Sequence, residues 1–138
     1  MSLKVSWVSK MNKKLIEVVA AVIISNDKYF VAQRANRGEL ALKWEFPGGK
    51  IELDETPENA LIRELKEELN INIQVNDYIT TVFHEYNSFY LKMHAYYAEI
   101  IDGSIFLNEH LDFKWVNRSQ ILNLDLAAAD IPIAKLIK

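Results

Sequence analysis

The residues of this sequence best suited to chemistry are carboxylates gathered into one short segment. Residues 52–68 hold seven of them, opposed by only two basic residues, Arg63 and Lys66. The seven are Glu52, Asp54, Glu55, Glu58, Glu64, Glu67 and Glu68. Two glycines, Gly48 and Gly49, come just before this segment. Such a segment is either a solvated helix face or a site that binds a cation.

Three of these carboxylates share one face if the segment is helical. Glu64, Glu67 and Glu68 are spaced i, i+3 and i+4, and each like-charged pair at this spacing costs about a few tenths of a kcal/mol. A hard cation such as Mg²⁺ prefers carboxylate, carbonyl and water oxygens, and the glycines allow a backbone carbonyl to approach closely. The charge pattern alone leaves the alternative of an exposed charged face open.

The local signals predict that the helix begins after Thr56 and ends near Asn70. Thr56 can cap the first turn, and Pro57 suits the first helical position because its missing N–H is not needed there. Asn70 suits the left-handed residue that often ends a helix. An apolar stripe on a second face consists of Leu61, Leu65 and Leu69.

Apolar patterns elsewhere predict a sheet flanked by helices. Residues 15–24 form a β-branched apolar run typical of a strand buried on both faces, and residues 28–34 would pair with it as a hairpin. Further strands are predicted at residues 71–75, 78–86, 89–101 and 113–116, and helices at residues 119–124 and 130–138. This order indicates a mixed sheet between helices, an α/β or α+β fold.

Composition limits the function classes. The chain has 138 residues, half of them apolar, which suits one domain covering residues 1–138. The net charge of −3 argues against a nucleic acid polymer or an anionic membrane as partner, and no apolar run approaches a membrane span. The absence of cysteine excludes thiol chemistry and disulfides. Residues 1–13 lack the apolar centre of a secretory signal and are set aside as an N-terminal extension, flexible or left over from cloning. We therefore expect a cytoplasmic protein.

The order of the acidic residues resembles the Nudix box. The chain has Gly49, then Glu55, then "RELKEE" at residues 63–68, and then Asn70 followed by an apolar residue. Every fixed position of the box matches except a late glycine, which is Asn70 here, and asparagine tolerates the same backbone conformation. The segments "EVVAAVII", "VAQR", "LKWEFPGGKIE", "NEH" and "ADIPIAKL" also occur in the order seen in the MutT-like branch, among enzymes of the CTP and 8-oxo-dGTP pyrophosphohydrolase types.

The resemblance implies a fold and an activity. The fold would be an α/β/α sandwich with a mixed β-sheet between helices. The activity would be Mg²⁺-dependent hydrolysis of a nucleoside triphosphate to the monophosphate and pyrophosphate, with Mn²⁺ as a substitute ion. The expected substrate is CTP, dCTP or a modified pyrimidine nucleotide, and the protein would be a monomer or a homodimer. The alternatives are a MutT-type 8-oxo-dGTP pyrophosphohydrolase, a non-catalytic nucleotide-binding module, and an enzyme for another diphosphate such as a nucleotide sugar.

The resemblance also implies roles for the residues of the box. Glu67, Glu68 and the carbonyl of Gly48 would be metal ligands. Glu64 would orient or deprotonate the attacking water, or hold a second metal ion. Arg63 would orient a box carboxylate through a charge-assisted hydrogen bond, a role compatible with a simple surface pair with Glu67.

Two further carboxylates receive roles from the same resemblance. Glu55 would brace the loop near the start of the helix, where negative charge is favoured. Glu109, in "LNEHL", matches an additional acidic metal ligand on a distant loop, although alone it would be taken for a solvated carboxylate. His110 beside it is a weak candidate, and His84 and His94 fit strand patterns and are interpreted as structural.

Base recognition is assigned to Asp130, with Arg34 as a second substrate contact. Asp130 comes just before the last predicted helix, where its alternative role is a helix cap. In the family this position reads the base, and a carboxylate can accept a hydrogen bond from the cytosine amino group. Arg34 ends a predicted strand, and its alternative is a plain surface arginine. Four aromatic residues that could stack on a base are more often core residues: Trp44, Phe46, Phe83 and Tyr86.

Overall fold

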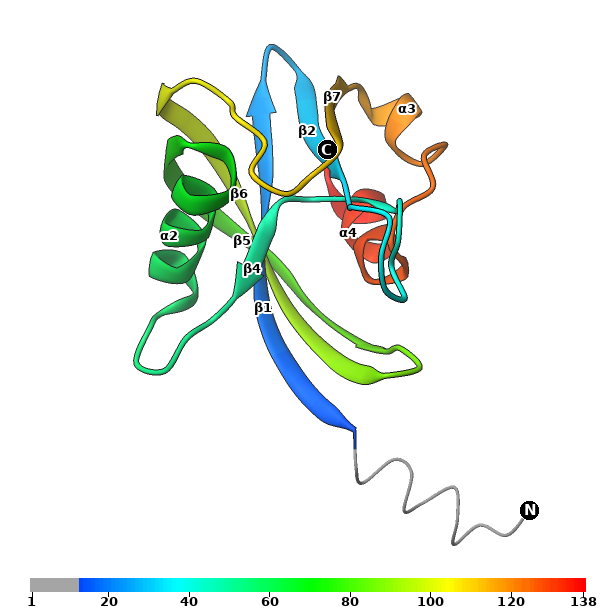
Figure 1. Cartoon of the computed structure of the whole chain (residues 1–138). Helices are drawn as coiled ribbons and strands as arrows, with labels where there is room; N and C mark the ends of the chain where they lie inside the picture. Colours follow the sequence, from blue (N-terminus) through cyan, green and yellow to red (C-terminus); the bar gives the residue numbers. More distant parts are fainter. Residues whose placement is uncertain (1–12) are drawn as a thin grey trace, which may run out of the picture.

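The computed structural model describes residues 13–138 (Figure 1). The predicted N-terminal extension lies outside the described residues, apart from Lys13. The strands are β1 (Lys14–Ser25), β2 (Lys28–Gln33), β3 (Trp44–Glu45), β4 (Gly48–Lys50), β5 (Ile71–Glu85), β6 (Phe89–Gly103) and β7 (Asp112–Val116). The helices are α2 (Pro57–Leu69), α3 (Arg118–Ile121) and α4 (Ile131–Leu136), the last preceded by a 3₁₀ turn, η1 (Ala128–Asp130).

The sheet is mixed, as predicted. Its main strand order is β3-β2-β1-β6-β5, with β4 paired to β1 and β7 paired to β2. The long strands β1 and β6 run parallel over ten residue pairs, from Lys14–Phe89 to Ile23–Ala98, while the other pairings are antiparallel. Because β1 pairs with β4 near its middle, the glycine segment is fixed directly beside the central strand.

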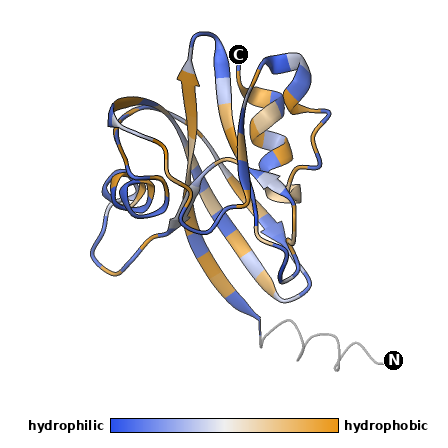
Figure 2. Ribbon diagram, turned by 45° about the horizontal axis from the view of Figure 1, so that its top comes forward, coloured by the Kyte–Doolittle hydropathy of each residue, from blue (hydrophilic) through white to orange (hydrophobic). Residues whose placement is uncertain are grey.

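Helices cover the two faces of this sheet (Figure 1). On β1, Val19, Ala21 and Ile23 pack with α2, whereas Ala20 and Val22 pack in the cluster that contains α4. Successive side chains of a strand point to opposite faces, so the continuous apolar run of β1 serves both layers. Figure 2 shows hydrophobic and hydrophilic residues alternating along the long strands. The predicted α/β/α arrangement is confirmed.

Helix α2 has the predicted ends and the predicted buried stripe. The Thr56 hydroxyl accepts a hydrogen bond from the Asn59 N–H at 3.1 Å, and Pro57 is the first helical residue. Asn70 adopts the left-handed conformation, with φ 60°, and its N–H donates to the Lys66 carbonyl at 3.1 Å. The buried residues of the helix are Ala60, Leu61, Leu65 and Leu69. The charged face is therefore left on the outside of this layer.

The structure differs from the sequence-based prediction in the middle of the chain. Two strands were predicted at residues 71–75 and 78–86, but β5 is one strand that pairs with β6 along its length. Register shifts between Val75 and Tyr78, and between Tyr78 and Thr80, absorb the polar residues that resembled a turn. The helix predicted at residues 119–124 is shorter, and the one predicted at 130–138 is split between η1 and α4. No helix within residues 13–138 is long and apolar enough to cross a membrane.

Candidate active site

A cavity with a volume of about 640 Å³ lies where β1, β4, α2 and the end of the β5–β6 hairpin meet the loop after β2. Six predicted site residues line it: Arg34, Gly48, Glu64, Glu68, Glu109 and Asp130. They come from five separate parts of the chain, so the fold has assembled them. Arg63 and Glu67 are not among the lining residues. The cavity has a carboxylate-rich end at α2 and another end at η1.

The two glycines are required by close packing around this cavity. A Cβ atom on Gly48 would collide with the carbonyl oxygen of Val19 on the neighbouring strand. A Cβ atom on Gly49 would collide with the carboxylate of Glu64. The sequence indicated that these glycines expose a carbonyl. The structure adds that Gly49 leaves the space in which the Glu64 carboxylate lies.

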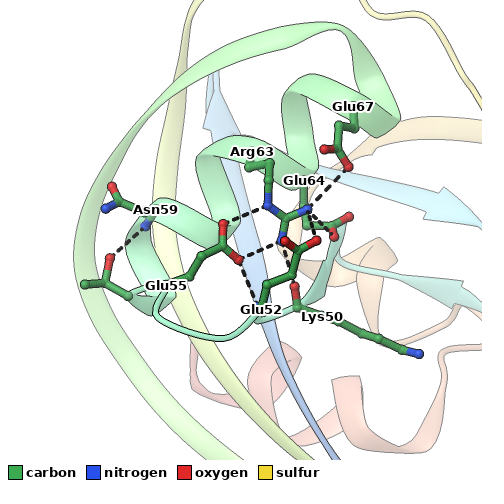
Figure 3. Close-up of polar contacts among 8 residues, drawn as sticks. Lys50, Glu52, Glu55, Asn59, Arg63, Glu64 and Glu67 are labelled. Atoms are coloured by element: carbon green, nitrogen blue, oxygen red, sulfur yellow. Dashed lines mark hydrogen bonds and ion pairs between the residues drawn. The ribbon is translucent and has the colours of Figure 1, made fainter.

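Arg63 is the centre of a hydrogen-bond network that joins α2 to the preceding loop (Figure 3). Its Nε and Nη2 donate to the two carboxylate oxygens of Glu55, at 2.7 and 2.8 Å, and Nη2 also donates to the Lys50 carbonyl at 3.0 Å. Its Nη1 donates to Glu64 at 2.9 Å and to Glu67 at 3.3 Å. A guanidinium held on several sides cannot turn freely, so it fixes the orientation of Glu64.

Glu55 braces this network from the loop. One of its oxygens also accepts the Glu52 N–H at 2.9 Å. The hydrogen bonds from Arg63 and from Glu52 lower the pKa of Glu55 from 4.5 to about 2. Glu55 is therefore ionised at any pH at which the protein would act, and it anchors the arginine that in turn orients Glu64.

We expect Glu55→Gln to reduce activity without direct contact with the reacting atoms. Glutamine cannot accept two charge-assisted hydrogen bonds from Arg63, so kcat should fall by about 10-fold, the low end of losses for outer-shell partners. In the folded protein the pKa of Glu55 lies below its unfolded value of 4.5. The ionised side chain therefore stabilises the fold above pH 4.5, and this stabilisation is lost as the pH falls toward 2.

Thermal unfolding at a series of pH values checks this expectation. The melting temperature of Glu55→Gln should lie below that of the wild type at pH 7, and the two should converge as the pH falls below 4.5. Glu99→Gln, on an exposed position of β6, controls for the loss of a negative charge. A difference that stays constant with pH would contradict the assignment of the stabilisation to the ionised carboxylate.

The carboxylates at the α2 end of the cavity lack full compensation by positive charge. Burial raises the pKa of Glu64, against the opposing effect of Arg63. Burial also raises the pKa of Glu68, and the negative charges of Glu109 and Glu64 add to this shift. These groups therefore gather negative potential at one end of the cavity, where a cation would be stabilised.

The donor set at this end fits a hard divalent cation such as Mg²⁺. Within residues 13–138, no three Asp, Glu, His or Cys side chains are arranged as a ready-made ion cage. Mg²⁺ commonly uses one or two carboxylates and completes its shell with water and substrate phosphates. Glu68, Glu109 and Gly48 line the cavity together, whereas Glu67 is more exposed and pairs with Arg63. The roles of all four as metal ligands stay predictions.

Asp130 lies buried at the opposite end, with 4% of its surface exposed. Its carboxyl makes no capping bond to α4, so the helix-cap alternative does not describe it. Instead, its Oδ1 accepts the Phe46 N–H at 3.2 Å. Burial, aided by the negative charge of Glu45, raises the pKa of Asp130 well above its usual value, while the Phe46 N–H and Arg34 oppose this shift. The structure therefore favours a neutral acid, which can donate a hydrogen bond as well as accept one.

Glu45 is a cavity residue that sequence reasoning missed. Its Oε1 accepts a hydrogen bond from Nη1 of Arg34 at 3.1 Å, and its Oε2 accepts one from Nε2 of His110 at 2.9 Å. It thus joins Arg34, a predicted substrate contact, to the histidine beside Glu109. No spacing rule marks Glu45, since its partners are brought together only by strand pairing and by the loop before β7.

The other candidates from the sequence divide between the cavity and the rest of the molecule. Phe46 and Tyr86 line the cavity. Trp44 is buried under Lys114, and Phe83 is 70% exposed on the sheet. His84 and His94 lie on β5 and β6, as their strand patterns predicted, and neither lines the cavity.

Residues 19–136 match the model of the NUDIX domain family. The chain therefore belongs to the NUDIX family, and the predicted enzyme class, a Nudix hydrolase, is confirmed.

Two curated relatives and two solved structures illustrate the similarity. The chain is 39% identical over 120 residues to the CTP pyrophosphohydrolase of Escherichia coli K12, covering 87% of this chain and 89% of the relative. It is 31% identical over 126 residues to the 8-oxo-dGTP diphosphatase of the same organism, covering 91% and 98%. The E. coli ORF135 protein superposes with a TM-score of 0.77 at 38% identity, covering 91% and 90%. A MutT Nudix hydrolase from Burkholderia pseudomallei gives a TM-score of 0.82 at 23% identity, covering 91% and 100%, and supports the fold alone.

Proposed function

We propose that this Nudix hydrolase is a Mg²⁺-dependent nucleoside triphosphate pyrophosphohydrolase that acts on CTP, dCTP or a modified pyrimidine nucleotide. The observation that carries the proposal is that one cavity joins the Nudix-box carboxylates to a buried Asp130. The end of the cavity at α2 suits a metal-bound phosphate chain, and the end at Asp130 offers hydrogen bonds to a base. A cytosine-directed relative with 39% identity supports the choice of base.

The proposed reaction assigns distinct tasks to the carboxylates. Bound Mg²⁺ would neutralise phosphate oxygens and lower the pKa of a water molecule. Glu68, Glu109, Glu67 and the Gly48 carbonyl would hold the ion. Glu64 would accept the proton of the attacking water, a task open to a carboxylate that lines the cavity. Water adds to the β-phosphorus, the bond to the α–β bridging oxygen breaks, and the nucleoside monophosphate leaves.

The alternative substrate is 8-oxo-dGTP. A neutral Asp130 presents a donor and an acceptor side by side, as an asparagine amide does. This pair could bond to N3 and the amino group of cytosine, or to O6 and N1–H of a guanine. The similarity to an 8-oxo-dGTP diphosphatase supports this second candidate.

A nucleotide panel tests the proposed activity. The protein is incubated with Mg²⁺ and CTP, dCTP, 5-methyl-dCTP, dGTP and 8-oxo-dGTP in ¹⁸O-labelled water, and the products are resolved. Pyrophosphate carrying the label is expected, with the highest kcat/KM for a cytosine nucleotide. Release of orthophosphate would contradict the pyrophosphohydrolase assignment. Nucleotide binding in calorimetry without turnover would instead favour the non-catalytic module.

Asp130→Asn is expected to remain folded and active with little change in base preference. Asparagine keeps an acceptor for the Phe46 N–H and adds a permanent donor, as a neutral acid does. We expect kcat for the preferred substrate to stay within about 10-fold, and the ratio of kcat/KM between cytosine and guanine nucleotides to change by less than about 10-fold, the discrimination that the loss of one hydrogen-bonded base contact would cause.

The same variant should be more stable than the wild type at neutral pH. The folded pKa of Asp130 lies above the unfolded value of 3.8, so the fold binds the proton more tightly. Wild-type stability therefore falls as the pH rises from 3.8 through the folded pKa. Asparagine removes this loss, and melting temperatures should separate at pH 7 and converge toward pH 3.8. A lower melting temperature for the variant at pH 7 would contradict the neutral buried acid.

The remaining expectations from the sequence stay predictions. They are a cytoplasmic location, a monomer or homodimer, and a small-molecule nucleotide in place of a nucleic acid polymer or a membrane. Gel filtration of the purified protein addresses the oligomeric state. The substitution of Mn²⁺ for Mg²⁺ is addressed by repeating the panel with each ion.

A further inference from the structure

The loop between β2 and β3 is tied to the far end of the β5–β6 hairpin by one side chain, Glu39. Its Oε2 accepts the Asn87 N–H at 2.6 Å. Its Oε1 accepts the Ser88 N–H at 3.1 Å and the Ser88 hydroxyl at 2.7 Å. A single carboxylate therefore satisfies three donors of a turn that lies 48 residues further along the chain. These hydrogen bonds lower the pKa of Glu39, so the side chain makes them as an anion.

Both segments joined by Glu39 form walls of the cavity. The loop contributes Arg37 and Leu40 to the lining, and the hairpin end contributes Tyr86 and Phe89. Glu39 itself is not a lining residue. It therefore holds two walls together from outside the cavity lining. The loop between β2 and β3, cyan in Figure 1, lies on the same side of the sheet as α4. Glu64, Glu67 and Glu68 come from α2 and are not part of either segment.

The hairpin end is linked in turn to the candidate base-reading residue. The Tyr86 hydroxyl accepts the Ala129 N–H at 2.9 Å, and Ala129 is the neighbour of Asp130. The Tyr86 N–H donates to the Phe89 carbonyl at 2.9 Å, which closes the hairpin around the turn held by Glu39. A displacement of this turn would therefore move Tyr86 and, through it, the backbone that carries Asp130.

The loop needs such an anchor because its own backbone includes unfavourable conformations. Leu42 has φ 64° and Gly38 has φ 78°, both in the left-handed region. A leucine there is uncommon and strained, so it persists only where the surroundings hold it. The Leu42 N–H makes a long bond of 3.3 Å to the Ala35 carbonyl, within the loop itself. The contacts of Glu39 join the loop to the hairpin.

We propose that Glu39 is a positioning residue that sets the shape of the base end of the cavity, and through it substrate affinity and base selectivity. The proposal rests on the proposed function, because it concerns the substrate of the same site. Glu39 acts through Tyr86 and Asp130 and touches no reacting atom. Its loss should therefore raise KM and alter selectivity while leaving the chemistry at α2 intact.

The test compares Glu39→Ala and Glu39→Gln with the wild type on the nucleotide panel. We expect Glu39→Ala to raise KM by about 5- to 10-fold, the effect of one to two net hydrogen bonds, with kcat within about 2-fold. The ratio of kcat/KM between cytosine and guanine nucleotides should change by about 3-fold or more. Glu39→Gln should have a smaller effect, because its amide oxygen still accepts one hydrogen bond.

We call the three hydrogen bonds from Asn87 and Ser88 to Glu39 the latch. Two further variants distinguish the loss of the latch from general damage to the fold. Ser88→Ala removes one of the three hydrogen bonds and should raise KM less than Glu39→Ala, and the double variant should equal Glu39→Ala alone. Glu99→Gln, exposed and outside the cavity, should behave as the wild type. An unchanged KM for Glu39→Ala, or an equal loss of kcat/KM for every nucleotide, would overturn the proposal, as would additive effects in the double variant.

Amide hydrogen exchange gives a readout independent of turnover. The amides of Asn87 and Ser88 should exchange faster in Glu39→Ala than in the wild type, and unchanged exchange would overturn the latch. If the wild type binds nucleotides but hydrolyses none, the proposed function fails. Weaker nucleotide binding by Glu39→Ala in calorimetry would still support the latch in that case, and equal binding would overturn it.

Discussion

Gly49→Ala is expected to leave the chain folded and nearly inactive, whereas Gly48→Ala is expected to prevent folding. The difference lies in what each new methyl group would meet. At Gly48 it meets the carbonyl oxygen of Val19 in the central strand, which cannot move without breaking the pairing of β1 and β4. At Gly49 it meets the end of the Glu64 side chain, which can rotate. The first change displaces backbone and the second displaces a carboxylate.

The expected magnitudes follow from these two displacements. Gly48→Ala should destabilise the fold by about 4 kcal/mol or more, a large share of the stability of an ordinary domain. Gly49→Ala should lower kcat by about 100-fold, the cost of misplacing a reacting group by about 1 Å. Circular dichroism and nucleotide turnover measure the two effects. Glu99→Gln, on an exposed position of β6, serves as the folding control. A folded Gly48→Ala or a fully active Gly49→Ala would contradict this account.

The sequence predicted helix α2 well because its signals are local. Thr56, Pro57 and Asn70 mark its ends through contacts within a few residues, and the leucine stripe repeats at the helical period. Glu64, Glu67 and Glu68 lie on this helix, so their arrangement could be predicted with it. The strand boundary near Asn76 was wrong because a β-bulge, which depends on pairing with β6, imitates a turn in the sequence.

The opposite end of the cavity was much less predictable. Asp130 was recognised only by resemblance. Its carboxyl accepts the Phe46 N–H, and burial and the charge of Glu45 raise its pKa; both partners lie more than eighty residues earlier. Glu45 and Glu39 carry no sequence signal, because each acts through partners brought close by tertiary packing. The end of the cavity at Asp130 therefore depends on long-range contacts, whereas Glu64, Glu67 and Glu68 are placed by one helix.

Glu64→Gln is expected to lower kcat by about 10²- to 10⁴-fold, the usual contribution of a general base. Glutamine has nearly the same shape and can still accept the hydrogen bond from Arg63, so the fold and the cavity should be preserved. It cannot take a proton from water. KM should stay close to the wild-type value, since the base end and the other carboxylates are unchanged. Glu99→Gln again controls for charge, and full activity in Glu64→Gln would contradict any catalytic role.

A Mg²⁺ titration of the same variant separates the two roles open to Glu64. If the carboxylate acts on the water, kcat stays low at saturating Mg²⁺ and the Mg²⁺ concentration for half-maximal rate is unchanged. If it holds a second ion, that concentration rises and excess Mg²⁺ restores part of kcat. Glu68→Gln provides the comparison, because Glu68 is a proposed metal ligand that feels the negative charges of Glu109 and Glu64, and it should show the second behaviour. The contrast between the two variants would then assign each carboxylate of the helix to the ion or to the water.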